Sequence, residues 1–331
     1  MPIVYDDIAE ICRDREKLIT WLREQELLGD FSGLCNSCNK GNVYLRTDKS
    51  YSKDQLVWRC SNGNCNKKIS IREGSWFSGS HLLLDQIVKL TYYWVYKCAA
   101  EFVTRELKIG SEHTIVDWYD FARLVCLKIL EQDNEQIGGV GKEVEIDESK
   151  FGKRKYHRGK RVDGVWVFGG IERQSKKSFF QVVEDRSAAT LIPIIKKYVK
   201  PGTQILSDCW KAYSTLKEEG YTHLTVNHSV EFKNKDTGAC TNLIESTWNA
   251  VKKSLPRSGT QKQMYHGYLM EYVIRKKYIN DKEDKFCAFL ELIKRVYPVK
   301  KREILGQLPV ATGFNPLWNV DLNSSLNDFQ L

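Results

Sequence analysis

The stretch from Val140 to Lys253 constrains the fold of this chain most, because its apolar residues change period several times within about a hundred residues. Three segments alternate like strands or are apolar between charged turns, which predicts an antiparallel meander. After the meander, helical spacing and short apolar runs take turns, with Ser187 as a plausible helix N-cap. The predicted order is strands at 142–149, 165–172 and 178–185, a helix at 187–200, a strand at 204–207, a helix at about 211–219, a strand at 222–226, and a helix that opens near Thr241.

Three carboxylates occupy matching positions on these elements. Asp147 lies at the end of the first strand, Asp208 follows the fourth strand, and Glu245 lies on the late helix. This element order, with acids at these places, is that of an RNase H-like core, an α/β fold with a mixed five-stranded sheet and flanking helices. Its first and fourth strands are neighbours, so we expect Asp147 and Asp208 to share a metal ion, with Glu245 completing the site.

The chemistry explains why acids are needed there. Two divalent ions about 4 Å apart can hold the attacking and leaving oxygens of a phosphodiester, and Mg²⁺ or Mn²⁺ takes hard oxygen ligands from separate rigid elements. With 42 acidic residues in the chain, any single strand-end aspartate is more often a solvated charge or a turn former. The conjunction of three acids on the right elements favours a metal site that carries catalysis.

Basic residues near these acids are candidate DNA contacts. Lys252 lies seven residues after Glu245 on the same helical face, where its ammonium group could hold a phosphate, although Lys253 could serve instead. A basic run directly follows the first strand and is well placed to grip a DNA backbone, although such runs are usually solvated loops. The residues of the run are Lys150, Lys153, Arg154, Lys155, Arg158, Lys160 and Arg161.

The chain resembles the Merlin superfamily of DNA transposases, which is related to bacterial insertion-sequence transposases with a DDE catalytic domain. The resemblance implies that Asp147, Asp208 and Glu245 are the catalytic triad, with 36 residues between the last two. It also implies DNA cleavage and strand transfer by two metal ions, double-stranded DNA as partner, and a dimer or larger synaptic complex. Because His228 lies in the matching TVNHS segment, it is a further candidate neighbour of the site that contacts DNA. The segments that carry it are VEIDESKFGKRK (144–155), RGKRVDGVWVFGGIER (158–173), DRSAATLIPIIKKYVKPGTQILSDCWKAY (185–213), TVNHS (225–229) and TNLIESTWNAVKK (241–253).

Four cysteines before this stretch have the spacing of a zinc site. Cys35 and Cys38 form C-x2-C, and after 21 residues Cys60 and Cys65 form C-x4-C. Four thiolates satisfy tetrahedral zinc, and the alternating segment between the pairs favours a zinc ribbon with one structural Zn²⁺. Related transposases carry a zinc-binding module at this position. The alternative from spacing alone is a set of unpaired structural cysteines.

The remaining segments read as helices. One or two short helices are expected in residues 3–28, and two helices joined at Ile109-Gly110 have the shape of a helix-turn-helix, with His113 and Arg123 as possible DNA contacts. Three helices packed as a spacer bundle are the alternative. Helices at about 262–279 and 285–296 are expected to cover the sheet. The predicted domains are 1–32 (helical), 33–79 (zinc ribbon), 80–135 (helix-turn-helix-like, DNA-binding), 140–300 (catalytic) and 301–331 (tail).

Composition agrees with a DNA-binding protein. The formal net charge of +9 points to a polyanionic partner. No signal peptide is expected, and charged residues interrupt the most apolar window, 82–103, so we expect no membrane association. We expect a nuclear location in a eukaryotic host, which we prefer, or the cytoplasm and nucleoid of a bacterium. Two other functions stay open: a domesticated, transposase-derived DNA-binding regulator, and a structure-selective nuclease built on the same core.

Overall fold

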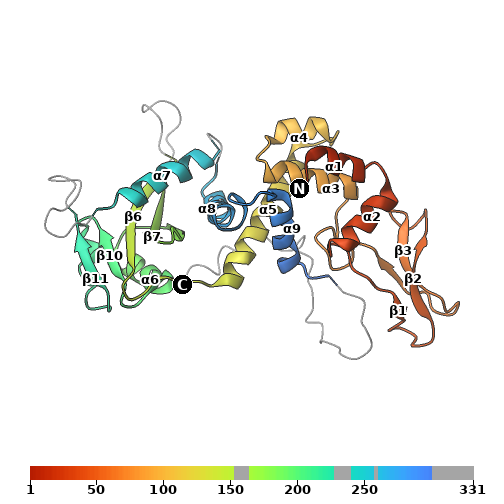
Figure 1. Ribbon diagram of the computed structural model, residues 1–331, viewed down its shortest axis with the longest axis horizontal. Coiled ribbons are helices and arrows are strands. Elements are labelled where there is room, and N and C mark those ends of the chain that lie inside the picture. The colour runs from red at the N-terminus through yellow and green to blue at the C-terminus, as the bar shows by residue number, and fades with distance from the viewer. Residues whose placement is uncertain (153–163, 227–239, 257–259, 300–331) are drawn as a thin grey trace. The chain divides into compact units, whose positions relative to one another are not determined.

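The computed structural model describes residues 1–152, 164–226, 240–256 and 260–299 (Figure 1). The chain forms two compact units. The first consists of Met1–Val125 together with Tyr278–Leu331, and the second of Cys126–Lys277. Within the described ranges, every helix is too short or too polar to cross a membrane.

The first unit begins with two short helices, α1 (Tyr5–Ile11) and α2 (Arg15–Glu24), as predicted. Asp14 is the N-cap of α2, where its side chain accepts hydrogen bonds from the backbone N–H groups of Glu16 and Lys17. These bonds satisfy amides that the first helical turn leaves without a carbonyl partner. Ile8 of α1 and Leu18, Ile19 and Leu22 of α2 are buried in the core of this unit.

A four-stranded antiparallel sheet, in the order β1-β2-β3-β4, follows in the same unit. Arg72, just after β4, forms a buried bidentate ion pair with Asp54, with both N–O distances at 2.6 Å. Its guanidinium also donates to the backbone carbonyls of Ser80 and Leu82. One buried cation therefore connects the sheet to the segment that follows β4. The strands are β1 (Gly33–Leu34), β2 (Asn42–Thr47), β3 (Leu56–Cys60) and β4 (Lys68–Ser70).

Helices complete the first unit. The last helix, which was expected to cover the catalytic sheet, packs instead against α3 in this unit, where Phe289 and Trp94 lie 4.5 Å apart between ring centroids. That expectation was wrong because an amphipathic pattern shows that a face is buried but not what buries it. The helices are α3 (Leu84–Val95), α4 (Ala100–Glu106), α5 (Glu112–Asp133, which ends in the second unit) and α9 (Lys285–Val296).

The second unit is built on a mixed five-stranded sheet in the order β11-β10-β6-β7-β8. The β7 strand is antiparallel to both β6 and β8, whereas β6, β10 and β11 run parallel. The mixed sheet, the antiparallel meander of its first three strands and the neighbouring positions of β6 and β10 were predicted; the place and direction of β11 were not. The strands are β6 (Glu143–Phe151), β7 (Val165–Glu172), β8 (Ser178–Val183), β10 (Gln204–Ser207) and β11 (Thr222–Thr225).

Helices cover both faces of this sheet, because successive strand residues point to opposite sides. Ile146 and Phe168 face a core shared with α6, and Phe151 and Phe180 face a core shared with α7 and α8. A short parallel pair, β5 with β9, accompanies the sheet. The remaining elements are β5 (Ile137–Gly138), α6 (Ala188–Tyr198), β9 (Val199–Lys200), α7 (Asn242–Ser254), α8 (Met264–Ile274) and η3 (Arg275–Ile279).

The segment after β10 differs from the prediction. A helix was expected over about 211–219, but only a single 3₁₀ turn, η2 (Lys211–Tyr213), forms, and turns follow it. Tyr213 and Leu216 are both fully buried and lie three residues apart. A spacing of three places side chains above one another in a 3₁₀ turn, so the pattern of buried residues is satisfied without an α-helix.

Candidate active site

The parallel pairing of β6 and β10 brings two of the predicted acids to one edge of the sheet. Glu145 on β6 is the register partner of Leu206 on β10. Two residues further along each segment come Asp147 and Asp208. Since parallel strands end at the same edge, this register places the two carboxylates beside each other, as the sequence predicted.

Asp147 is held in place by a tryptophan. The indole Nε1–H of Trp248, on α7, donates a hydrogen bond of 2.9 Å to Oδ2 of Asp147. Burial raises the pKa of Asp147 to about 6, and the negative charges of Asp208 and Glu245 add to the rise. Hydrogen bonds from Trp248 and from the backbone N–H of Glu148 oppose it. The negative charges of Asp208 and Glu245 therefore reach the carboxyl group of Asp147.

The third acid, Glu245, lies exposed in the first turn of α7, where the side chain of Thr241 contacts its Oε1 at 3.2 Å. The position of this turn is set from the sheet. Oε2 of the buried Glu145 accepts the backbone N–H groups of Leu243 and Ile244, both at 2.9 Å. A carboxylate at a helix N-terminus satisfies open amides and complements the helix dipole.

Arg173 completes this anchor. Its Nε donates to Oε1 of Glu145 at 2.7 Å, and one of its terminal nitrogens donates to the backbone carbonyl of Cys240 at 2.9 Å. Glu145 is therefore a buried charge with a paired cation and two amide donors, the condition under which a buried carboxylate is tolerated. Through Arg173 and Glu145, strands β6 and β7 fix the start of the helix that carries Glu245.

Two further groups lie beside the acids on the α6 face of the sheet. Glu148 accepts a short hydrogen bond from the hydroxyl of the fully buried Tyr213. Burial raises the pKa of Glu148 to about 7, and the charges of Asp147 and Asp208 add to the rise. The edge of the sheet therefore carries a fourth carboxyl group, which the sequence reading treated as part of a strand only.

Lys252 lies alongside the site on α7. Its ammonium donates to Oγ of Ser149 at 2.7 Å and lies 5.2 Å from the ring centroid of Phe151. Ser149 is two residues beyond Asp147 on β6 and on the same face of that strand. The predicted proximity of Lys252 to the acids is thus present, while its contact with a DNA phosphate stays a prediction.

The donor set suits hard divalent cations. Two aspartates and a glutamate supply carboxylate oxygens of the kind that Mg²⁺ and Mn²⁺ bind. Burial and neighbouring negative charge raise the pKa of Asp147, which means that they destabilise its ionised form. A bound cation would stabilise that ionised form. Within the described ranges, however, the ligand atoms that already converge on one point belong to cysteines.

Those cysteines form the predicted cluster in the first unit. The Sγ atoms of Cys35 and Cys65 are 3.8 Å apart, those of Cys38 and Cys60 are 3.6 Å apart, and all four lie within 4.8 Å of one another. Four thiolates bound about 2.3 Å from a tetrahedral zinc ion would be about 3.8 Å from one another. The cluster therefore fits zinc, and it could hold one ion.

Backbone amides support this reading. The N–H groups of Lys40 and Gly41 lower the pKa of the Cys38 thiol to about 6, which favours the thiolate that a metal binds. Burial raises the pKa of the Cys60 thiol to about 12, so the case for zinc rests on the positions of the four sulfur atoms. A Cβ added at Gly41 would lie 2.7 Å from Sγ of Cys60. Only glycine fits at this position beside the cluster.

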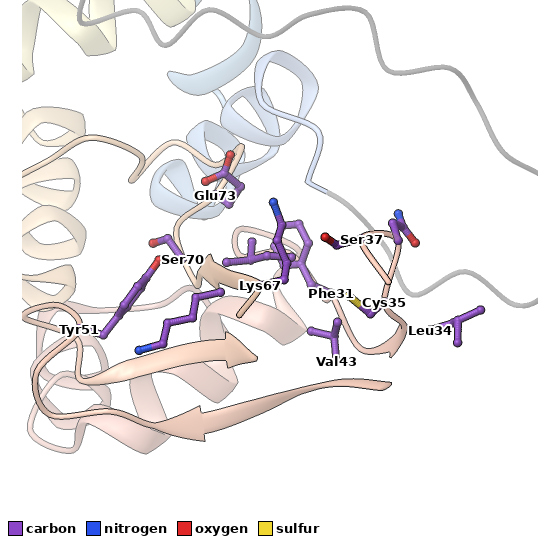
Figure 2. Close-up of a pocket in the computed structure, with 12 residues that line it drawn as sticks. Phe31, Leu34, Cys35, Ser37, Val43, Tyr51, Lys67, Ser70 and Glu73 are labelled. Carbon is purple, nitrogen blue, oxygen red and sulfur yellow. The ribbon is translucent and has the colours of Figure 1, made fainter. Parts of the chain in front are cut away.

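A cavity of about 390 Å³ opens beside the cysteine cluster. Figure 2 shows Phe31 and Val43 among its apolar lining residues, and Lys67 and Glu73 among the charged ones. Because groups of both charges line it, its electrostatics select no class of ligand.

Comparison with known proteins identifies the family. The ISXO2-like transposase domain matches residues 136–280, which include all three acids. A transposase-like protein of Haemophilus influenzae is 32% identical over 96 residues, which are 29% of this chain and 76% of that protein. The chain belongs to this transposase family. The narrower assignment to the Merlin superfamily stays a prediction.

Similar solved structures include viral integrases and a transposase, at low similarity. The simian T-cell lymphotropic virus intasome bound to the PP2A subunit B56γ gives 14% identity, covers 69% of this chain and 79% of that chain, and has a TM-score of 0.29. The catalytic core of BIV integrase is 12% identical, covers 57% of this chain and 98% of that chain, and has a TM-score of 0.25. A pre-cleavage Mos1 transpososome is 11% identical, covers 63% of this chain and 76% of that chain, and has a TM-score of 0.25. TM-scores this low assign neither fold nor function to the transposase.

The predicted DNA contacts fall into three groups. Arg123 is buried and paired with Asp120 at 2.5 Å on α5, so the suggestion that it contacts DNA is wrong. The exposed residues of the first half of α5 include Glu112 and Asp117 beside His113, a charge that does not favour a recognition helix. The others, Lys153, Arg154, Lys155, Arg158, Lys160, Arg161 and His228, lie outside the described residues.

Sequence reasoning missed the groups that hold the acids. It treated Trp248 as a core residue and assigned no role to Glu145, Glu148, Arg173 or Tyr213. One signal was available for Glu145, because a carboxylate on a strand covered on both faces needs a buried partner. The identity of that partner, 28 residues away in the chain, follows only from the pairing of the strands.

Proposed function

We propose that this transposase moves DNA by a cut-and-paste route with Asp147, Asp208 and Glu245 as its catalytic triad. The observation that supports the proposal is the parallel register of β6 and β10, which brings Asp147 and Asp208 to one edge of the sheet in a chain of the transposase family. The chain's resemblance to Merlin transposases supports the same assignment. Transposon ends and target DNA are the proposed substrates.

Two phosphoryl transfers make up the proposed reaction. In the first, the oxygen of water bonds to phosphorus at the transposon end, the P–O3′ bond breaks, and the 3′ oxygen leaves as a hydroxyl group. In the second, that 3′-hydroxyl attacks a target phosphodiester and displaces another 3′ oxygen. Two Mg²⁺ or Mn²⁺ ions, when bound, would orient the reacting oxygens and offset developing negative charge.

The chain's own groups have distinct roles in this proposal. Asp147 and Asp208 would hold both ions, and Glu245 would hold one of them. Trp248 orients Asp147, while Glu145 with Arg173 fixes the turn that carries Glu245. Lys252 and the basic run at 153–161 would bind DNA phosphates, and His228 would lie near the reacting strand.

Recognition of DNA ends is assigned to the first unit. The zinc-binding ribbon, with one structural Zn²⁺, and the helices after it would bind the terminal inverted repeats. Joining two ends requires two copies of the transposase, so we propose a dimer or larger synaptic complex, located in the nucleus if the host is a eukaryote.

A strand-transfer assay tests the proposal. Purified protein with Mg²⁺ or Mn²⁺ is given a plasmid target and DNA that carries the inverted repeats flanking its gene. We expect joined products from the wild type and from Asp281→Ala, an exposed aspartate in the first unit, and none from Asp208→Ala. Tight DNA binding without cleavage would favour a DNA-binding regulator, and cleavage of branched substrates without joining would favour a nuclease.

A further inference from the structure

Cations and aromatic rings alternate in a stack at the end of the sheet that carries the acids. Lys150 Nζ lies 5.5 Å from the ring centroid of Trp166, and the guanidinium carbon of Arg186 lies 4.2 Å from the same ring. Arg186 is also 4.5 Å from the ring of Trp210. These four side chains, here called the cation–aromatic ladder, all belong to the second unit.

The backbone places the ladder at the carboxyl edge. Lys150 and Trp166 are register partners on β6 and β7, Arg186 precedes the N-cap of α6, and Trp210 comes two residues after Asp208. The ladder is therefore built from the same strand ends as the candidate active site. It places positive charge next to carboxylates that would repel a DNA phosphate.

Trp210 is fixed in position while its ring is open to solvent. Its backbone N–H donates to Oδ1 of Asp208 and its indole Nε1–H donates to the carbonyl oxygen of Arg186, both at 3.0 Å. The residue nevertheless keeps 40% of its surface exposed. Within the described part of the second unit, no other large hydrophobic aromatic residue is exposed. An ordered ring that stays in water gains little for folding but is prepared to bind a flat partner.

We propose that the ladder binds an unpaired nucleotide of the DNA next to the bond that is cut. The base would stack on Trp210, and the cations of Arg186 and Lys150 would bind its phosphates. This inference rests on the proposed function, because it makes the nucleotide a neighbour of the phosphodiester held at Asp208. Bases within a duplex already stack on both faces, so an exposed ring of this kind favours single-stranded DNA.

The positive charges of Arg186 and Lys150 favour a nucleotide over an aromatic side chain of a protein as the stacking partner. Arg186 and Lys150 flank the rings, so the surface alternates a planar stacking group with groups that pair with phosphate. A nucleic acid strand presents this same alternation of bases and phosphates. The carboxylates beside the ladder would repel an acidic peptide, whereas the proposed reaction on DNA requires these same carboxylates.

Binding of forked DNA tests the inference. Full-length protein is titrated, without added Mg²⁺ or Mn²⁺, against a labelled transposon-end duplex and against the same end with single-stranded arms beyond the cleavage point. We expect the wild type to prefer the fork. Trp210→Ala should remove about tenfold of that preference, the scale of base–aromatic stacking, and Trp210→Phe should keep most of it.

Controls separate this result from other effects. Val140→Ala, at an exposed apolar residue of the same unit, should leave the preference intact. If Trp210→Ala does not fold, Arg186→Gln takes its place and should weaken fork binding. An unchanged preference in the ladder variants, or no preference in the wild type, overturns the inference. Strand transfer by the wild type is scored separately, so failure of the catalytic proposal is seen independently of the binding result.

Discussion

Trp248 and Asp147 are joined by a hydrogen bond of 2.9 Å from the indole Nε1–H to Oδ2 of the carboxylate. The indole packs edge-on against Phe151, at 5.8 Å between ring centroids, and in a tilted arrangement against Phe180, at 5.1 Å. Trp248 lies three residues after Glu245 on α7, so a single helix supplies one candidate ligand and orients another. Any motion of α7 would therefore disturb two of the three acids together.

The role of this hydrogen bond is tested by Trp248→Phe, which keeps an aromatic ring but removes the N–H donor. We expect strand cleavage to fall about tenfold, the cost of losing one hydrogen bond to a charged group, and the Mg²⁺ concentration for half-maximal rate to rise. The Phe variant should unfold at nearly the wild-type denaturant midpoint. An unchanged Mg²⁺ titration would show that Trp248 only packs.

Gly169 makes room for this tryptophan. It is the register partner of Asp147, and a Cβ added there would lie 2.6 Å from Phe180 and 2.7 Å from the ring of Trp248. We expect Gly169→Ala to push the indole aside, to lower stability by about 1–3 kcal/mol, and to lower cleavage as Trp248→Phe does. Gly110→Ala, where a Cβ meets nothing within 4 Å, is the control in both assays.

The anchor of α7 is tested by Glu145→Gln. The amide oxygen can still accept one backbone N–H, but Arg173 loses its shorter ion pair and keeps only the one with Glu143, at 3.3 Å. We expect this change to cost about 1–3 kcal/mol. We expect a lower unfolding midpoint and a larger loss of cleavage at low Mg²⁺ than at high Mg²⁺. Glu218→Gln, at an exposed glutamate, should change neither, and equal losses at all Mg²⁺ concentrations would argue against positioning of Glu245.

The sequence was sufficient where a local pattern decides the structure. Alternation around Ile146 and the run before Asp208 predicted the strands of the sheet, and the element order predicted that the two strands are neighbours, although their parallel direction came from the structure. Groups whose partners come from elsewhere in the fold were not predictable in this way. Glu145 alternates with apolar neighbours, a pattern typical of a strand with one face in solvent. The pattern is the same whether water or α7 covers Glu145.

Zinc removal should act on the first unit. We expect one zinc per chain by elemental analysis, loss of that metal in Cys38→Ser, and a lower unfolding midpoint, because binding of the metal is coupled to folding of the sheet that presents the thiolates. Cys126→Ser, at a buried cysteine outside the cluster, should keep the zinc. A full zinc content in Cys38→Ser would remove this residue from the set of ligands.

The raised pKa of Asp147 makes stability depend on pH. Because its pKa of about 6 lies above the ordinary value of 3.8, the folded chain binds this proton more tightly than the unfolded chain. Its contribution is therefore full below about pH 4 and is lost as pH rises through 6. Without divalent ions, Asp147→Asn should be up to about 3 kcal/mol more stable than the wild type at pH 8 and should lose this advantage near pH 4.

Divalent ions should reduce that difference in stability. At pH 8, Mg²⁺ would bind the ionised carboxylate of the wild type and stabilise it, whereas the amide of Asp147→Asn offers no charge, so the gap between the two should narrow as Mg²⁺ is added. Denaturant unfolding gives the free energy of unfolding of each variant under four conditions: pH 4 and pH 8, each with and without Mg²⁺. Asp281→Asn should follow the wild type throughout. If Asp147→Asn were no more stable at pH 8 without Mg²⁺, the carboxylate would not be strained by burial and neighbouring charge, and the electrostatic case for a cation at this edge would fail.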